Sequence, residues 1–211
     1  MNSRGAFITL EGIEGAGKST CMALVRQLLQ ASGLPFIETR EPGGTLLGEE
    51  LRALLLDHRS AGMSPDTELL LMFAARSEHL QQKILPAMEA GRWVLCDRFT
   101  DATYAYQGGG RGIPAARIRI LEEWVQKGVK PDLTLLLDLP PEIGLTRAGK
   151  RSTPDRFETE ALSFFNRVRQ AYLDLARAEP GRIRIVDASR PLPEVEARVA
   201  ELVREFVSSW H

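Results

Sequence analysis

The sequence predicts an α/β fold, with a five-stranded parallel sheet flanked by helices in a single domain spanning residues 1–211. Short runs of β-branched, aromatic and other apolar residues alternate with longer segments of helical periodicity. Several of the short runs are apolar at nearly every position, as strands covered on both faces are. A chain of 211 residues with 44% hydrophobic content is long enough to bury one substantial core.

The expected strands are short, and their ends carry charge or glycine. The run Leu133 to Leu137 shows no alternation with polar positions beyond Thr134, which predicts a strand covered on both faces. Because ligands of open parallel sheets collect at the carboxyl ends of strands, these ends are the expected site. In chain order the expected strands are Ala6–Leu10, Phe36–Thr39, Trp93–Asp97, Leu133–Leu139 and Ile183–Asp187.

The segments between these runs have apolar residues at helical spacing. Behind the first strand, Met22, Val25 and Leu29 form one such stripe. Residues 107–112 and 149–154 lack the pattern, so we expect two flexible segments able to close over ligands. In chain order the expected helices are Lys18–Ser32, Leu46–Asp57, Asp66–Ala90, Pro114–Gln126, Glu142–Ala148, Glu158–Ala178 and Leu192–Val207.

Residues 12–19 read Gly-Ile-Glu-Gly-Ala-Gly-Lys-Ser and match the G-x-x-x-x-G-K-[ST] phosphate-loop pattern between the first strand and the first helix. Gly15 and Gly17 let backbone N–H groups point at phosphate oxygens, and the helix N-terminus favours the same anion. Lys18 is expected to meet the β- and γ-phosphates, and the Ser19 hydroxyl to bind Mg²⁺. The motif therefore predicts a nucleotide ligand.

Charged residues follow the next two strands. Asp97 and Arg98 end the third run, so adjoining strands would place a carboxylate near magnesium and a guanidinium near a second anion. After the second run, a turn rich in Pro and Gly exposes Arg40 and Glu41, and Arg52 lies on the following helix. Taken singly, each group also fits solvated surface charge.

Two further segments offer contacts for a flat ligand. Met72, Phe73 and Arg76 lie within one helical turn, where an apolar surface and a cation can flank a ring, although such a stripe also fits a core. Gln107 precedes a glycine run and is suited to read a base edge, although the run also fits a mobile connection.

Three arginines lie within or beside residues 149–154 and predict a cationic lid at about residues 147–157. They are Arg147, Arg151 and Arg156. In phosphoryl transfer a protein mainly positions substrates and stabilises the charge on the moving group, which a lid arginine can do. The alternative is a solvated charge run.

Composition narrows the class of protein. Lys and Arg total 27 against 28 Asp and Glu, so no global basic field indicates a nucleic-acid polymer as partner. No leader peptide or membrane-spanning apolar stretch is evident. Cys21 and Cys96 fit reduced thiols in a cytoplasmic protein, and no Cys or His spacing indicates zinc.

Together the segments GIEGAGKS, TREPGGT, FAAR, Asp97-Arg98, AYQGGGRG and DRFE closely resemble the bacterial thymidylate kinases, which are P-loop nucleoside monophosphate kinases, over nearly the whole chain. The resemblance implies transfer of the γ-phosphate of ATP to dTMP, giving dTDP and ADP. It also implies a requirement for Mg²⁺ and assembly as a homodimer.

The resemblance assigns roles to individual residues. Lys18, Asp97, Arg98 and Arg151 would be catalytic, with Ser19 and Asp97 on the metal side. The implied ATP contacts are Gly12, Ile13, Glu14, Gly15, Ala16, Gly17, Lys18, Ser19, Thr20 and Arg147. The implied dTMP contacts are Glu14, Glu41, Arg52, Met72, Phe73, Arg76, Arg98, Thr103, Tyr106 and Gln107.

Within the dTMP set, Arg98 would bind the phosphate and Arg76 would bind a thymine carbonyl. Thr103 and Gln107 would contact the base edge, and the Tyr106 ring would crowd a ribose 2′-hydroxyl. Many relatives place an aromatic residue at the position of Met72, so either Met72 or Phe73 would pack on thymine. Relatives often have serine at the position of Ala102, where a hydroxyl contact is lost.

The phosphate loop carries no arginine at its variable positions, which resembles family members that supply the catalytic arginine from the lid. Arg151 is the first choice for that arginine. Arg147 would then stack on adenine and Arg156 contact phosphates, but the division among the three stays open.

Two alternatives remain at this point. One is another nucleoside or nucleotide kinase on the same scaffold, since few pocket contacts decide base identity. The other is a nucleotide-dependent switch without an acceptor, although Asn2 and Asn166, the only asparagines, exclude an N-K-x-D guanine-reading motif.

Overall fold

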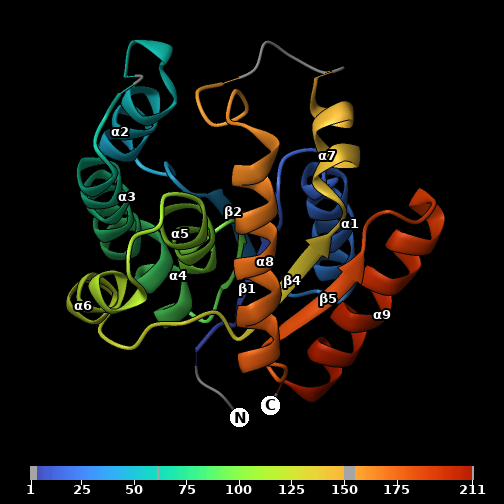
Figure 1. Ribbon diagram of the computed structural model, residues 1–211. Helices are drawn as coiled ribbons and strands as arrows, with labels where there is room; N and C mark the ends of the chain where they lie inside the picture. Colours follow the sequence, from blue (N-terminus) through green and yellow to red (C-terminus); the bar gives the residue numbers. More distant parts are fainter. Residues whose placement is uncertain (1–3, 61, 150–154, 211) are drawn as a thin grey trace.

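A parallel sheet of five strands in the order β2-β3-β1-β4-β5 forms the centre of the computed structural model, which describes residues 4–60, 62–149 and 155–210 (Figure 1). Every expected strand is present, with bounds within one residue of those predicted. The strands are β1 (Phe7–Glu11), β2 (Phe36–Arg40), β3 (Trp93–Asp97), β4 (Leu133–Asp138) and β5 (Ile183–Asp187).

Helices lie on both faces of this sheet. The longest expected helix, Asp66–Ala90, is a continuous run of α3, a π-helical turn η2 and α4, and the helix expected from Glu158 begins at Leu162. The helices are α1 (Lys18–Ala31), α2 (Leu46–Leu56), α3 (Pro65–His79), α4 (Leu85–Glu89), α5 (Thr100–Thr103), α6 (Ala115–Gln126), α7 (Pro141–Ala148), α8 (Leu162–Ala178) and α9 (Leu192–Ser209), with the short turns η1 (His58–Ser60), η2 (Leu80–Ile84) and η3 (Tyr104–Gly110).

The segment expected to be flexible at residues 107–112 is instead largely helical, so that prediction is wrong. Its glycines bring η3 close to α8. A Cβ built on Gly110 would lie 2.4 Å from the Phe164 ring, and one on Gly109 would lie 2.8 Å from the Arg167 carbonyl oxygen. Here the glycines serve close packing rather than mobility.

Two sets of helices bury the sheet. α1 and α9 pack together on one face, while α4, η3 and α8 cover the other (Figure 1). On the α4 face, Phe7 packs edge-on against Phe99 with ring centroids 4.9 Å apart, beside Leu80 and Ile84. Burying each such side chain contributes about 1.5–3 kcal/mol of stability. None of the described helices is long and apolar enough to cross a membrane.

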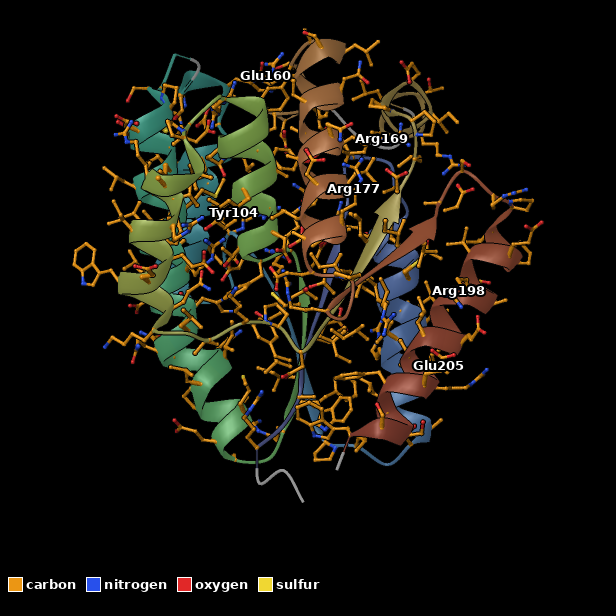
Figure 2. The ribbon with its side chains drawn as sticks, turned by 60° about the horizontal axis from the view of Figure 1, so that its bottom comes forward. Tyr104, Glu160, Arg169, Arg177, Arg198 and Glu205 are labelled. Carbon is orange, nitrogen blue, oxygen red and sulfur yellow. The ribbon has the colours of Figure 1, made fainter. Side chains whose placement is uncertain are left out.

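The strand register gathers the charged strand ends. Leu10 of β1 pairs with Asp97 of β3, and Asp97 also pairs with Arg40 of β2. On the other side, Arg169 of α8 donates to Asp138 at the end of β4 at 2.7 Å (Figure 2). The carboxyl ends therefore meet beneath α2, α7 and the start of α8, as the sequence predicted.

Candidate active site

The phosphate loop runs from β1 to α1 and is locked from two sides. Gly15 has φ 71°, and a Cβ there would lie 1.9 Å from the carbonyl oxygen of Gly144 in α7. Glycine is thus required both for the left-handed backbone and for contact with α7. From the helix, Lys18 Nζ donates to the carbonyl oxygens of Gly12 (3.1 Å) and Ile13 (3.2 Å). The loop is shaped before any ligand arrives.

The start of α1 offers free donors to an anion. Gly17 at the N-cap has φ 90° and makes no side-chain cap. Ser19 and Thr20 follow on the first turn and are exposed. Uncapped N–H groups at a helix N-terminus attract phosphate, so this end fits the expected nucleotide contacts.

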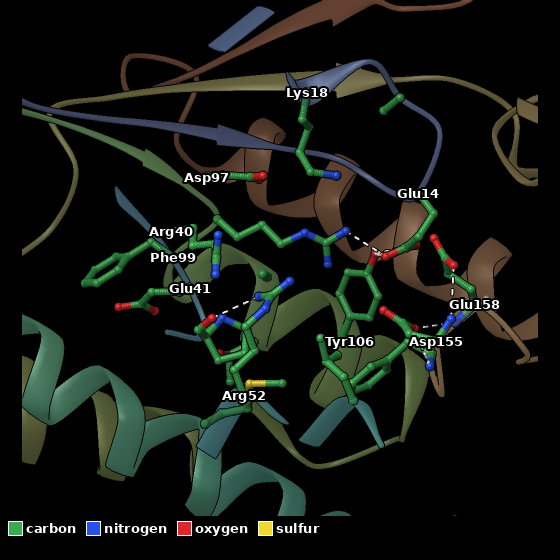
Figure 3. A pocket seen from close by; sticks show the side chains of 18 of the residues that line it. Glu14, Lys18, Arg40, Glu41, Arg52, Asp97, Phe99, Tyr106, Asp155 and Glu158 are labelled. Carbon is green, nitrogen blue, oxygen red and sulfur yellow. Dashed lines mark hydrogen bonds and ion pairs between the residues drawn. The ribbon is translucent and has the colours of Figure 1, made fainter. Parts of the chain in front are cut away.

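A cavity of about 250 Å³ opens beside the loop (Figure 3). Figure 3 shows Lys18 and Asp97 on one wall, Arg52 on the opposite wall, and Tyr106 near Glu14. It is lined by Glu14, Gly15, Ala16, Gly17, Lys18, Ser19, Arg40, Glu41, Pro42, Arg52, Leu56, Met72, Arg76, Asp97, Arg98, Phe99, Ala102, Thr103, Tyr106, Gln107, Asp155, Phe157 and Glu158.

Arg98, Glu14 and Tyr106 form one hydrogen-bonded group on this cavity. Arg98 Nη2 donates to Glu14 Oε1 at 2.7 Å, and its guanidinium lies 4.6 Å from the centroid of the Tyr106 ring. The Tyr106 hydroxyl lies 2.7 and 2.8 Å from the two Glu14 oxygens. Burial would raise the pKa of Glu14, but the charges of Arg98 and Lys18 outweigh it and lower that pKa.

Cations crowd the mouth of the cavity. Burial lowers the pKa of Arg52, and the neighbouring charges of Arg40 and Arg98 lower it further. Lys18 has its pKa lowered by burial and by Arg98, against the opposing charge of Asp97. Positive groups that repel one another in this way are stabilised by a polyanion, which fits two phosphate-bearing ligands.

Arg76 lies at the far end of the cavity with one donor free. Its Nε donates to Glu41 Oε2 at 2.8 Å and its Nη2 to Thr103 Oγ1 at 2.9 Å. Nη1 is buried and has no hydrogen-bond partner among the described residues. A buried N–H is costly without an acceptor, so Nη1 fits a carbonyl oxygen of a ligand.

Asp97 presents the corresponding orphan acceptor near the phosphate loop. Its Oδ1 is buried without a hydrogen-bond partner in the described part of the chain. Asp97 and the Ser19 hydroxyl line the same cavity, and hard oxygen donors of this kind suit Mg²⁺ with its waters. The residues present therefore fit the magnesium ion that the sequence predicted.

The structure separates the two candidates for an apolar contact with a base. Met72 lines the cavity, whereas Phe73 is 2% exposed and packs with Leu69, Ile113 and Ile118. Neighbouring residues on a helix point about 100° apart, so the two side chains face different surroundings. The prediction of Phe73 as a ligand contact is wrong.

The three lid arginines are distributed differently. Arg156 is buried, donating to the Leu55 carbonyl at 2.8 Å and to Glu68 Oε2 at 2.7 Å, and it does not line the cavity. Arg147 donates to the carbonyl of Ala188 after β5 at 2.9 Å. Arg151 lies outside the described residues.

The sequence reasoning missed three buried polar groups that support the site. His79 donates from Nδ1 to Glu41 Oε1 (3.0 Å), and its Nε2 lies 2.6 Å from the Thr39 hydroxyl oxygen, so it holds the carboxylate that binds Arg76. Glu68, on α3, is 0% exposed. Both lie on α3, where polar and apolar residues are not separated onto distinct faces, so no local pattern indicated which polar side chains are buried.

Glu11, the last residue of β1, is the third of these groups. It accepts from the Phe99 N–H and from the Tyr172 hydroxyl, each at 2.7 Å. Burial, with a smaller effect of Asp101, raises the pKa of Glu11 to about 8. The Phe99 N–H follows Arg98, whose φ of 69° is left-handed, so Glu11 stabilises the turn that aims Arg98.

Comparisons with known proteins agree with this geometry. Residues 10–199 match the family model described as thymidylate kinase. The thymidylate kinase of Alkalilimnicola ehrlichii is 57% identical over 209 residues, 99% of this chain and 96% of that protein. The thymidylate kinase of Nitrosomonas eutropha is 58% identical over 206 residues, which cover 98% of this chain and 95% of that protein. The crystal structure of thymidylate kinase from Ehrlichia chaffeensis superposes with a TM-score of 0.76 at 33% identity, covering 95% of this chain and 99% of that chain.

Proposed function

Since the chain belongs to the thymidylate kinase family and transfers the γ-phosphate of ATP to dTMP with Mg²⁺, we propose that the phosphate loop binds ATP and that the 250 Å³ cavity binds dTMP. The observation that carries this proposal is the buried free donor of Arg76 at the end of a cavity whose mouth is cationic. A base carbonyl and a phosphate separated by a sugar match these two ends.

The reaction is an in-line displacement. A dTMP phosphate oxygen attacks the γ-phosphorus, and the bond to the oxygen that leaves with ADP breaks. The protein's part is to position both nucleotides and to stabilise charge on the moving group. Lys18 and the N–H groups of the loop hold the ATP phosphates, while Arg98 and Arg52 hold the acceptor phosphate.

Ser19 and Asp97 would hold the magnesium, directly or through water. When bound, Mg²⁺ neutralises charge on the β- and γ-phosphates. Glu14 and Tyr106 adjoin the sugar region, where the Tyr106 ring would crowd a 2′-hydroxyl. Arg76 and Gln107 address the base, with Thr103 and Glu41 holding the Arg76 guanidinium. Arg147 would contact adenine.

Arg151 is our choice for the catalytic lid arginine, within one domain whose lid spans about residues 147–157. The support is elimination among the three arginines. Arg156 donates hydrogen bonds to Glu68 and to the Leu55 carbonyl, and Arg147 donates to the Ala188 carbonyl. Replacing each of the three by alanine tests this choice. If Arg151 is the catalytic lid arginine, Arg151→Ala should lose more turnover than the other two variants. Normal turnover in Arg151→Ala would contradict this choice.

A homodimer is supported by apolar side chains exposed on three neighbouring helices. Leu54 of α2, Leu70 of α3, and Ile120 and Trp124 of α6 are 47%, 57%, 64% and 75% exposed. Sedimentation velocity should give a dimer, and Trp124→Glu should shift it toward monomer.

The free, buried thiols of Cys21 and Cys96 support a cytoplasmic location.

Calorimetric titration tests the dTMP site directly. The wild-type protein should bind dTMP, and Arg76→Met should weaken binding at least about tenfold by removing the buried donor. Arg117→Met, which alters an exposed arginine paired with Asp66, is the matched control. Equal affinity of wild type and Arg76→Met would contradict the proposed orientation of the base.

A further inference from the structure

Glu68 accepts hydrogen bonds from three side chains although it is fully buried. Gln107 Nε2 of η3 donates to its Oε1 at 2.9 Å, and Arg156 Nη2 donates to its Oε2 at 2.7 Å. Arg111 donates from Nε and Nη2, each at 3.2 Å. A carboxylate held between two guanidinium groups has only acceptors to offer.

This environment settles which way the Gln107 side chain is turned. A glutamine amide has a donor end and an acceptor end, and its orientation follows from its hydrogen-bond partners. Since Glu68 can only accept, Gln107 must turn Nε2 toward Glu68. Its carbonyl oxygen, Oε1, finds no partner in the residues that the structure describes and is left for the cavity, which Gln107 lines.

Two groups then present a fixed pattern to a base edge. Gln107 offers an acceptor, and the buried Nη1 of Arg76 offers a donor. Thymine and uracil carry an N3–H donor next to a carbonyl acceptor and match both. Cytosine carries a bare N3 acceptor next to an amino donor and mismatches both.

We propose that Glu68 is a positioning residue that sets base specificity, because it holds the Gln107 amide with its carbonyl toward the cavity and so selects pyrimidines with an N3–H. The inference rests on the proposed dTMP site and assigns its selectivity to a residue outside the cavity lining. A site built to pair with a donor strongly rejects an analogue that lacks it, since the buried polar groups are left unpaired.

A purely structural role for Glu68 makes a different prediction. In Glu68→Gln, shape is kept, Arg156 retains the Leu55 carbonyl and Arg111 retains Glu160. The substituted amide, however, has a donor end as well as an acceptor end. The Gln107 amide can then flip, so that its donor end faces the cavity. The selectivity between bases should therefore change even if the fold does not.

The test compares dTMP with 5-methyl-dCMP, which differ only at the base edge, as acceptors for the wild type and for Glu68→Gln. The ratio of the two kcat/KM values should fall at least about tenfold in the variant, through loss with dTMP and gain with 5-methyl-dCMP. An unchanged ratio would overturn the inference. A wild-type enzyme that does not turn over dTMP would instead overturn the proposed function.

Glu160→Gln is the matched control. Glu160, just before the start of α8 at Leu162, also pairs with Arg111, and no hydrogen bond joins it to Gln107 in the part of the chain that the structure describes, so the same chemical change there should leave the ratio unchanged (Figure 2). A fall in the ratio equal to that of Glu68→Gln would assign the effect to Arg111 and overturn the role given to Glu68.

A double variant and a measurement on the wild type keep the inference testable if Glu68→Gln folds poorly. Glu68→Gln combined with Gln107→Glu places a carboxylate at position 107, which can only accept, so preference for dTMP should return. In the wild type, the Gln107 NH₂ signals, assigned by their loss in Gln107→Met, should be protected from solvent exchange with and without dTMP. Protection that appears only with dTMP would contradict the inference.

Discussion

Arg98 Nη2 lies 2.7 Å from Glu14 Oε1, so the end of β3 and the phosphate loop are joined by a partly buried ion pair at the centre of the cavity. Both members of the pair line the cavity beside the phosphate loop. The pair holds the guanidinium in place before substrates bind, which is how a preorganised site stabilises charge.

Arg98→Ala should lower kcat by about 10²–10³, since a single preorganised donor to the moving charge has an effect of that size. Steady-state kinetics with saturating ATP and dTMP measure it. Arg117→Ala, at an exposed ion pair, should retain full activity. A wild-type kcat in Arg98→Ala would remove Arg98 from the catalytic group.

Asp97→Asn should raise the Mg²⁺ concentration needed for half-maximal rate at least about tenfold, because a neutral amide is a poorer ligand for magnesium and its waters than a carboxylate. High Mg²⁺ should restore part of the rate. The exposed Asp66→Asn serves as control. An unchanged Mg²⁺ dependence in Asp97→Asn would show that the orphan oxygen serves something other than the metal.

Glu11 should make stability fall as pH rises from about 4.5 to about 8. Its pKa is raised from 4.5 to about 8 in the folded protein, chiefly by burial, so across this window the unfolded chain has lost a proton that the folded protein retains. The slope reaches at most about 1.4 kcal/mol per pH unit for one proton.

Denaturant titrations of the wild type and Glu11→Gln between pH 5 and 9 measure this effect. The glutamine can still accept from the Phe99 N–H, and it cannot ionise. The variant should therefore gain stability relative to the wild type as pH rises. A constant difference between the two proteins would contradict the raised pKa of Glu11.

Gly110→Ala should destabilise the fold by about 1–3 kcal/mol, the usual cost of overpacking, because the added methyl would meet the Phe164 ring. Gly181→Ala is the control, since a Cβ there meets nothing within 4 Å. Thermal unfolding compares the two. Equal melting temperatures would show that η3 and α8 are not tightly packed.

The sequence predicted the parts of the fold that local pattern determines. Apolar runs located all five strands, and the phosphate-loop motif located the nucleotide site and, through β1, the strand ends around it. A glycine run has no side chains to show a pattern, and η3 is helical because α8, more than fifty residues later, packs on it.

The sequence pattern also did not predict which charged side chains are buried. Locally, Glu68 resembles a solvated helix residue. Its hydrogen-bond partners Gln107, Arg111 and Arg156 lie 39, 43 and 88 residues away in the sequence. The choice between Met72 and Phe73 likewise depended on the packing of α3 against α6, which no local pattern carries. Long-range packing is what the sequence reasoning lacked in each case.

A coupled ADP-release assay measures whether the protein phosphorylates dTMP, with ATP and Mg²⁺ and, separately, dTMP, dUMP, dCMP, dGMP, AMP or thymidine as acceptor. ADP release that depends strongly on dTMP, with dCMP, dGMP and AMP inactive, is the predicted result. ADP release without an acceptor, or a preference for one of the other nucleotides, would contradict dTMP as the phosphate acceptor.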